Sequence, residues 1–130
     1  MTITSSNPTT TRIDDLDAIT ATIQLYIDGS IEGDLTKLQQ AFHVDARMFG
    51  DLGGVRYDVP IQTFFDLAVA EPTGGHRTKI ISIDHVGDGA VVVLAEEGYS
   101  GLDYVDFFTL VRVDGEWKIA NKVYSSSPTK

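Results

Sequence analysis

The chain contains no cysteine. Disulfide bonds, thiol catalysis and cysteine-ligated metals are therefore excluded. Basic residues are also few, since 10 Lys and Arg stand against 19 Asp and Glu, which gives a formal net charge of −9. An acidic protein repels phosphate backbones and anionic lipid surfaces, so we expect neither nucleic acid nor a membrane as a partner.

Long hydrophobic runs are missing as well. No apolar run approaches the ~20 residues that cross a bilayer, and residues 1–11 lack the basic and apolar regions of a signal peptide. We therefore expect a cytoplasmic protein. The composition, with 42% hydrophobic residues among 130, predicts a flexible arm over residues 1–12 and one domain over residues 13–126.

Sequence motifs of several common sites are absent too. There is no G-x-G-x-x-G, Walker or G-x-S-x-G sequence, and the three histidines show no H-x-H or H-x-x-x-H spacing. Nucleotide sites of those kinds, a serine nucleophile on a strand-to-helix turn and a zinc site therefore lack support. We expect no metal and no cofactor.

Hydrophobic periodicity indicates helices at the start of the chain. Apolar side chains recur at three- and four-residue steps from Leu16 to Ile27, which predicts a helix over residues 14–31 that Asp14 or Asp15 can cap. Asp34 can cap a second, short helix, and Pro60 suits the first turn of a third.

The remaining segments are typical of strands. We expect them at residues 44–51, 55–59, 77–86, 90–98, 102–113 and 116–125, which gives the order ααββαββββ. Consecutive strands joined by tight turns are antiparallel. The predicted fold class is α+β, with N-terminal helices packed on a curved, antiparallel or mixed sheet.

The turn at Asp114-Gly115 predicts which side chains share a face of the sheet. A two-residue turn of this type pairs Val113 with Glu116 and, by counting, Phe108 with Asn121. The face with the large aromatics then carries Tyr104, Asp106, Phe108, Leu110, Trp117, Ile119 and Asn121, and we expect the helices to cover it. The opposite face carries Val105, Phe107, Thr109, Val111, Lys118, Ala120, Lys122 and Tyr124.

That opposite face is rather apolar for the outside of a sheet. Such a surface suggests a partner. We therefore expect a homodimer through the outer residues Val105, Phe107, Thr109, Val111 and Tyr124.

Several segments resemble a known superfamily. They are Y-I-D-G at 26–29, G-D at 33–34, F-H-V-D-A at 42–46, I-I-S-I-D-H-V-G-D-G-A at 80–90 and the strand pair at 104–124. In order and spacing they resemble the nuclear transport factor 2-like (NTF2-like) domains, closest to the branch called "putative lumazine-binding" and near the SnoaL-like polyketide cyclases. The resemblance implies a cone-shaped, cystatin-like α+β fold and usually a dimer. It names no reaction, because members include isomerases, dehydratases, cyclases and inert carriers.

Asp106 is the leading candidate for chemistry. On the aromatic face it lies near Tyr104 and, by the predicted register, diagonally near Asn121. Poor solvation raises a carboxyl pKa toward the range of a general acid or base, with Tyr104 or Asn121 polarising an oxygen. The alternative is that Asp106 only satisfies a structural hydrogen bond.

We expect a pocket for a small organic ligand beneath the helices, since this fold rarely fills its own cone. Its predicted lining is Tyr26, Phe42, Phe49, Phe64, Phe108 and Trp117, with His76 at the mouth. His43 is expected to bond backbone at a corner, and His85, near a turn, to be solvated. Three functions stay open: a small-molecule pocket without chemistry, an isomerase-, cyclase- or dehydratase-type enzyme, and a dimerisation or interaction domain with a filled core.

Overall fold

The computed structural model describes residues 11–128, so most of the expected N-terminal arm lies outside the described part of the chain. The elements follow the predicted order ααββαββββ. They are α1 (Arg12–Glu32), α2 (Leu35–Ala41), β1 (Phe42–Leu52), β2 (Val55–Pro60), α3 (Ile61–Ala70), β3 (Arg77–Val86), β4 (Gly89–Tyr99), β5 (Leu102–Val113) and β6 (Glu116–Pro128).

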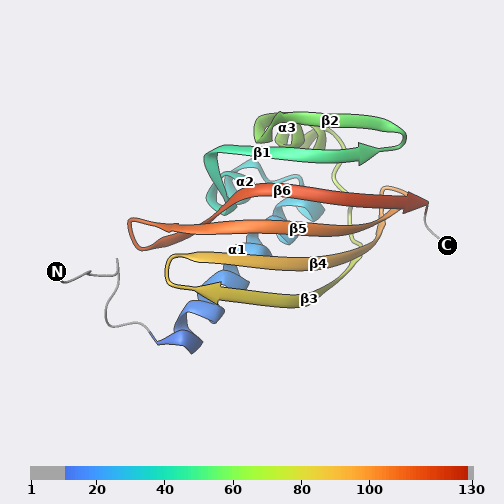
Figure 1. Ribbon diagram of the computed structural model, residues 1–130. Coiled ribbons are helices and arrows are strands. Elements are labelled where there is room, and N and C mark those ends of the chain that lie inside the picture. The colour runs from blue at the N-terminus through green and yellow to red at the C-terminus, as the bar shows by residue number, and fades with distance from the viewer. Residues whose placement is uncertain (1–10, 129–130) are drawn as a thin grey trace.

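The strands form one curved sheet in the order β2-β1-β6-β5-β4-β3, and the helices cover one of its faces (Figure 1). Of the two predicted arrangements, antiparallel or mixed, the structure has the second, because β1 and β6 pair in parallel. These two strands are far apart in the sequence, so no tight turn forces them to run in opposite directions. The sheet is therefore mixed.

Helix α1 begins earlier than the pattern predicted. Thr11 is its N-cap and forms a reciprocal capping box with Asp14, which satisfies two backbone groups at the helix start. Gly33 ends the helix in the left-handed conformation, with φ at +67°. Asp15 does not cap the helix; its side chain is buried against the sheet.

The β5–β6 hairpin follows the predicted register only near its turn. Val113 pairs with Glu116 and Leu110 with Ile119, but the next pairs are Thr109 with Asn121 and Phe108 with Lys122. One additional residue in β6, at Ala120, forms a β-bulge, which reverses the direction of every later side chain. The prediction that Asn121 shares the face of Asp106 is therefore wrong.

The bulge also exchanges residues between the two faces. Lys122 and Tyr124, both expected outside, are buried on the helix-covered face, while Val123 is exposed. Gly50 in β1 permits this packing, since a Cβ there would lie 2.6 Å from the backbone oxygen of Tyr124. Tyr124 is thus removed from the predicted dimer surface.

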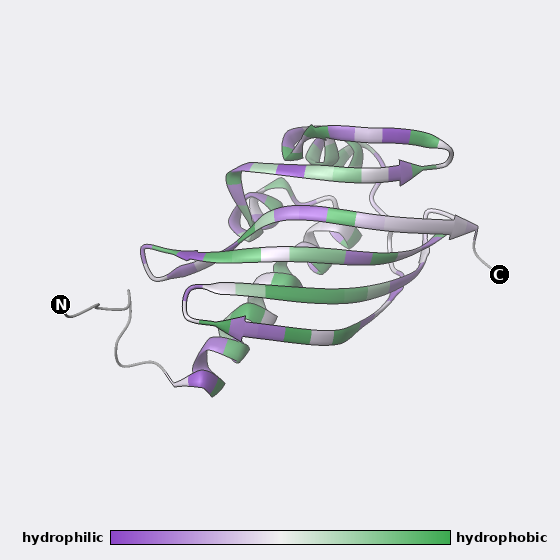
Figure 2. Cartoon of the chain, viewed as in Figure 1, coloured by the Kyte–Doolittle hydropathy of each residue, from purple (hydrophilic) through white to green (hydrophobic). Residues whose placement is uncertain are grey.

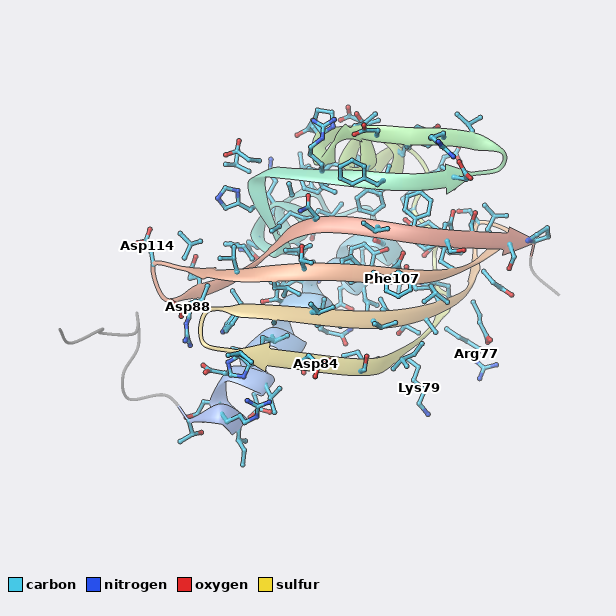
Figure 3. The ribbon with its side chains drawn as sticks, viewed as in Figure 1. Arg77, Lys79, Asp84, Asp88, Phe107 and Asp114 are labelled. Carbon is cyan, nitrogen blue, oxygen red and sulfur yellow. The ribbon has the colours of Figure 1, made fainter. Side chains whose placement is uncertain are left out.

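The core fills most of the space between helices and sheet. Figure 2 shows hydrophobic residues along most of β4 and in the middle of β5. Phe42 and Phe108 belong to this packed interior, where both rings contact the Tyr26 ring. On the uncovered face, Phe107 lies in mid-β5 (Figure 3) and is 44% exposed.

Candidate functional site

A cavity of about 270 Å³ lies between the helices and the sheet. Its walls come from helices α1 and α3 and from strands β1, β4, β5 and β6. Its size is near the lower end of the ~300–1,000 Å³ usual for ligand pockets. Most of the wall is apolar or aromatic, with polar groups at a few points. The principal lining residues are Tyr26, Met48, Leu52, Phe64, Leu67, Ala68, Glu96, Tyr99, Leu102, Tyr104, Lys122 and Tyr124.

Glu96 places a buried carboxylate in that wall. It lies on β4 and is 1% exposed. The Tyr26 hydroxyl donates to its Oε2 at 2.8 Å, and His76 Nε2 lies 2.7 Å from its Oε1. Burial, with the nearby carboxylates of Asp106 and Glu96, raises the pKa of the Tyr26 phenol well above its usual value, so this hydroxyl remains a donor.

His76 supports Glu96 from behind the cavity wall. Its ring is fully buried, and its Nδ1 lies 2.9 Å from Thr73 Oγ1. Burial lowers the pKa of His76, and the negative charge of Asp106 only partly opposes this. The partners of this neutral imidazole assign its proton to Nε2, which donates to Glu96, while Nδ1 accepts from the Thr73 hydroxyl.

Asp106 is completely buried on β5, directly beside the cavity lysine. Its Oδ1 accepts from Lys122 Nζ at 3.2 Å, whereas Oδ2 has no donor within residues 11–128. Burial raises the pKa of Asp106 well above the ordinary value; Lys122 opposes this rise, and a hydrogen bond to Glu96 together with its charge adds to it. The raised pKa favours the protonated form of Asp106.

Lys122 carries the positive charge of the site inside a ring of aromatic side chains. Its Nζ lies 4.5 Å from the ring centre of Tyr124 and 5.1 Å from that of Phe64, with Tyr26 and Tyr104 at 5.7 and 5.8 Å. Aromatic faces attract a cation most strongly when water is excluded. With one ammonium and two carboxyl groups, the cluster is electrically neutral when one carboxyl is protonated.

The tyrosines give the cavity further polar groups. Burial raises the pKa of Tyr124 to about 12, and its buried hydroxyl has no partner in the described part of the chain. Burial is also the main reason that the pKa values of Tyr99 and Tyr104 are raised. At neutral pH these phenols are hydrogen-bond donors facing an otherwise apolar space.

The predicted site residues are partly brought together. Tyr26, Phe64 and Tyr104 line the cavity, and Asp106 lies directly behind Lys122. His76 lies behind Glu96 and not in the lining.

The other predicted residues lie elsewhere. Phe42 and Phe108 fill the core, and Trp117 packs against His85 near the hairpin turns. Phe49 is half-buried and borders a shallow depression on the other side of the sheet. Asn121 pairs with Thr109, away from Asp106, because the bulge at Ala120 turns it outward.

Two charged residues of the site, Glu96 and Lys122, were not identified from the sequence. Charged residues in strands are usually solvated, so the sequence did not predict that these two side chains are buried. No glycine or proline stands near the bulge that turns Lys122 inward. The only sequence sign of it is that Ala120 and Asn121 interrupt the alternation of apolar and polar residues along β6. His43 accepts from the backbone N–H of Asp45, in agreement with the predicted corner role.

Between residues 11 and 128, no group of three or more His, Asp or Glu side chains is arranged to hold a metal ion. No helix in this part of the chain is long and apolar enough to cross a membrane.

Comparison with protein families gives one match over most of the chain. Residues 14–125 match the family described as "Putative lumazine-binding". A protein called aldolase FrzH, from Cladobotryum sp., is 28% identical over 115 residues, which cover 86% of this chain and 91% of that protein.

Solved structures show the same architecture. An NTF2-like protein of unknown function from Shewanella baltica has 31% sequence identity and a TM-score of 0.84, with 92% of this chain and 99% of that chain covered. A ketosteroid isomerase-like protein from Erwinia carotovora atroseptica has 18% identity and a TM-score of 0.68, with 88% and 98% covered. At that identity the second likeness concerns the fold alone.

Proposed function

The chain belongs to this family of NTF2-like proteins, and we propose that its pocket binds a small, mainly apolar carbonyl compound and moves protons on it. One observation carries the proposal. Asp106 and Glu96 form a buried carboxyl pair beside Lys122, at the wall of an apolar cavity.

The cost of burial supports a functional role for these groups. Removing several ionisable side chains from water is expensive, and apolar residues of similar volume usually serve stability as well or better. Perturbed carboxyl groups in a cavity are typical of acid–base sites. Asp106, whose pKa is raised, is the proposed acid of the cluster, and Glu96, which lines the cavity, is the proposed base.

The direction of the chemistry follows from the lining. A ligand oxygen placed near Lys122 would be polarised by the ammonium and the phenol donors. Polarisation acidifies the carbon next to a carbonyl, and Glu96 is positioned to accept that proton. Isomerisation, dehydration, cyclisation and aldol reactions all include such a step, and similarity to a protein named as an aldolase agrees with it.

The test uses an apolar cyclic ketone, 2-tetralone, in D₂O, with exchange of its α-protons followed by NMR. We expect wild-type protein to accelerate exchange, and Asp106→Asn and Glu96→Gln to slow it by about 10²-fold or more, the usual contribution of a general acid or base. Matched controls are Asp84→Asn and Glu97→Gln on the surface of the sheet, which should exchange at the wild-type rate. If 2-tetralone binds but its proton exchange is not accelerated, the protein is a carrier and the proposed acid–base role is wrong.

A homodimer through the uncovered face is a second part of the proposal. Register places Val93, Phe107 and Val123 in one row across β4, β5 and β6. Phe107 and Val123 are each more than two-fifths exposed. The proposed surface consists of Val105, Phe107, Thr109 and Val111 together with Val123.

Cytoplasmic location is likewise proposed, and cell fractionation tests it.

Light scattering tests the dimer. Phe107→Glu introduces a charge into the apolar row and should give monomers, whereas Val44→Glu, at an exposed corner of β1, should leave the dimer intact. A monomeric wild-type protein would refute the dimer without affecting the pocket.

A further inference from the structure

We infer that Lys122 is a nucleophile that forms an imine with an aldehyde or ketone in the cavity; this inference rests on the proposed function and makes it covalent. The amine lines the cavity, its side chain is 5% exposed, and it points among four aromatic rings. A role limited to balancing charge does not require the lysine to border the ligand space.

The other lysines whose side-chain contacts are known lie in different surroundings. Lys37 Nζ is 2.8 Å from the Glu32 carboxylate at the surface, and Lys118 Nζ donates to the backbone oxygen of Gln40 at 2.6 Å. Neither borders the cavity. Lys122 is therefore the amine that a bound carbonyl compound would meet.

Asp106 supplies the proton transfers that imine formation needs. An amine attacks only in its neutral form. When Asp106 is ionised, moving one proton across the 3.2 Å between Lys122 Nζ and Asp106 Oδ1 converts the ion pair into a neutral amine and a neutral carboxyl. The raised pKa of Asp106 makes this carboxyl form accessible.

The step then balances in atoms and charge. The Nζ lone pair forms a bond to the carbonyl carbon, and the π electrons move to the oxygen. The oxygen receives a proton that nitrogen loses, relayed by the carboxyl groups, which gives a neutral carbinolamine. Asp106 next donates its proton to that hydroxyl, the C–O bond breaks, and water leaves. The products are an iminium on Lys122, an Asp106 carboxylate and one water molecule.

The site is suited to the iminium for the same reasons that it holds the ammonium. The positive charge stays on Nζ, next to a carboxylate and surrounded by four aromatic side chains. No charge is created or lost in the buried cluster, so the reaction avoids a large desolvation penalty. An iminium also acidifies the neighbouring C–H bond more than a hydrogen-bonded carbonyl does, and Glu96 lies in the same wall.

The experiment traps the iminium by reduction. Full-length protein is incubated with 2-naphthaldehyde and sodium cyanoborohydride, which converts an iminium into a stable naphthylmethyl amine, and the modified lysines are mapped by peptide mass spectrometry. We expect Lys122 to be labelled at least about tenfold faster than Lys37 or Lys118, because the cavity positions the aldehyde against it. Asp106→Asn should remove this advantage while leaving the labelling of Lys37 and Lys118 unchanged.

Binding of the unreactive alcohol 2-naphthylmethanol, followed by ligand-observed NMR, separates the two ways to fail. If the alcohol binds and Lys122 is labelled no faster than the surface lysines, the imine is refuted and the pocket stands. If neither binding nor selective labelling occurs, both the pocket proposal and the imine are wrong. Because the mapping is done on wild-type protein, the result does not depend on whether a variant without the Lys122 amine folds.

Discussion

Two regions of this protein bury charge, and they do so in different ways. At the hairpin end of the sheet, where Figure 3 labels Asp88 and Asp114, Arg112 is enclosed by two carboxylates. At the cavity, Lys122 pairs with Asp106, and Glu96 lines the same open space. Both regions hold buried charged side chains on the helix-covered face of the sheet, but only the second leaves room for another molecule.

The hairpin end has the arrangement of a structural lock. Arg112 Nη1 lies 2.6 Å from Asp15, and its Nε lies 2.8 Å from Asp88. Its guanidinium also lies 5.0 Å from the ring centre of Trp117. Asp15, one of the two residues expected to cap α1, thereby ties the first turn of that helix to β5, and its second oxygen lies 3.2 Å from His85 Nε2.

The cavity end has open space beside its buried polar groups. An oxygen of Asp106 and the hydroxyl of Tyr124 are buried without a partner among residues 11–128. A group that is buried but unsatisfied costs about 1–3 kcal/mol in a finished structure. His85 Nδ1, at the hairpin end, is also buried without a partner among residues 11–128, so the open space beside the buried charges is what distinguishes the cavity end.

The largest contrast is expected from removing one charge in each region. Arg112→Met should lower the free energy of unfolding by about 3–5 kcal/mol, because it leaves Asp15 buried without its cation. Glu96→Gln should cost less than about 1.5 kcal/mol, since Asp106 can take over the negative charge opposite Lys122 and the amide oxygen still accepts from Tyr26. Urea unfolding measures both. Equal losses would show that the cavity cluster is also a structural lock.

The next contrast uses two tyrosines of the cavity itself. Tyr26→Phe removes a hydroxyl that donates to a carboxylate and should lower stability by about 1.5–3 kcal/mol. Tyr124→Phe removes an unpartnered hydroxyl, so unfolding should cost the same energy or up to about 1 kcal/mol more. Thermal and urea denaturation of the pair decide this. A clear loss for Tyr124→Phe would mean that its hydroxyl has a structural partner.

A smaller effect is expected in the pH dependence of stability. The pKa of Asp106 is raised in the folded state, so between the unfolded value of ~3.9 and that raised value the folded protein binds more protons than the unfolded chain. Stability from this group is complete below ~3.9 and is lost as pH rises through the folded pKa, by at most about 1.4 kcal/mol per pH unit.

Asp106→Asn should lack this decline, and Asp84→Asn should retain it. Urea unfolding between pH 4 and 8 provides the curves. If wild type and Asp106→Asn run parallel over this range, the proton on Asp106 is absent.

The sequence predicted the elements well because local signals determine them. Apolar spacing located the long helix, and Asp114-Gly115 located the last hairpin and its first four pairs. Asp106 could be selected because alternation held along β5. Prediction stopped at Ala120, where the β-bulge is marked by no turn residue in the sequence.

That single shift explains most of what was missed in the site. It replaced Asn121 by Lys122 as the partner of Asp106 and brought Tyr124 inside. His85, expected to be solvated near its turn, is buried because Asp15 and Trp117 enclose it. His85 lies 70 positions from Asp15 and 32 from Trp117, and no local sequence pattern predicts contacts over such separations.

The central claim is that the cavity wall holds a proton on Asp106, and side-chain carboxyl ¹³C NMR measures it directly. Protein labelled at aspartate carboxyl carbons is titrated, with Asp106→Asn used to assign the signal. The account predicts that the Asp106 carboxyl remains protonated well above the pH at which exposed aspartates ordinarily ionise. Titration of Asp106 together with those surface aspartates would contradict it.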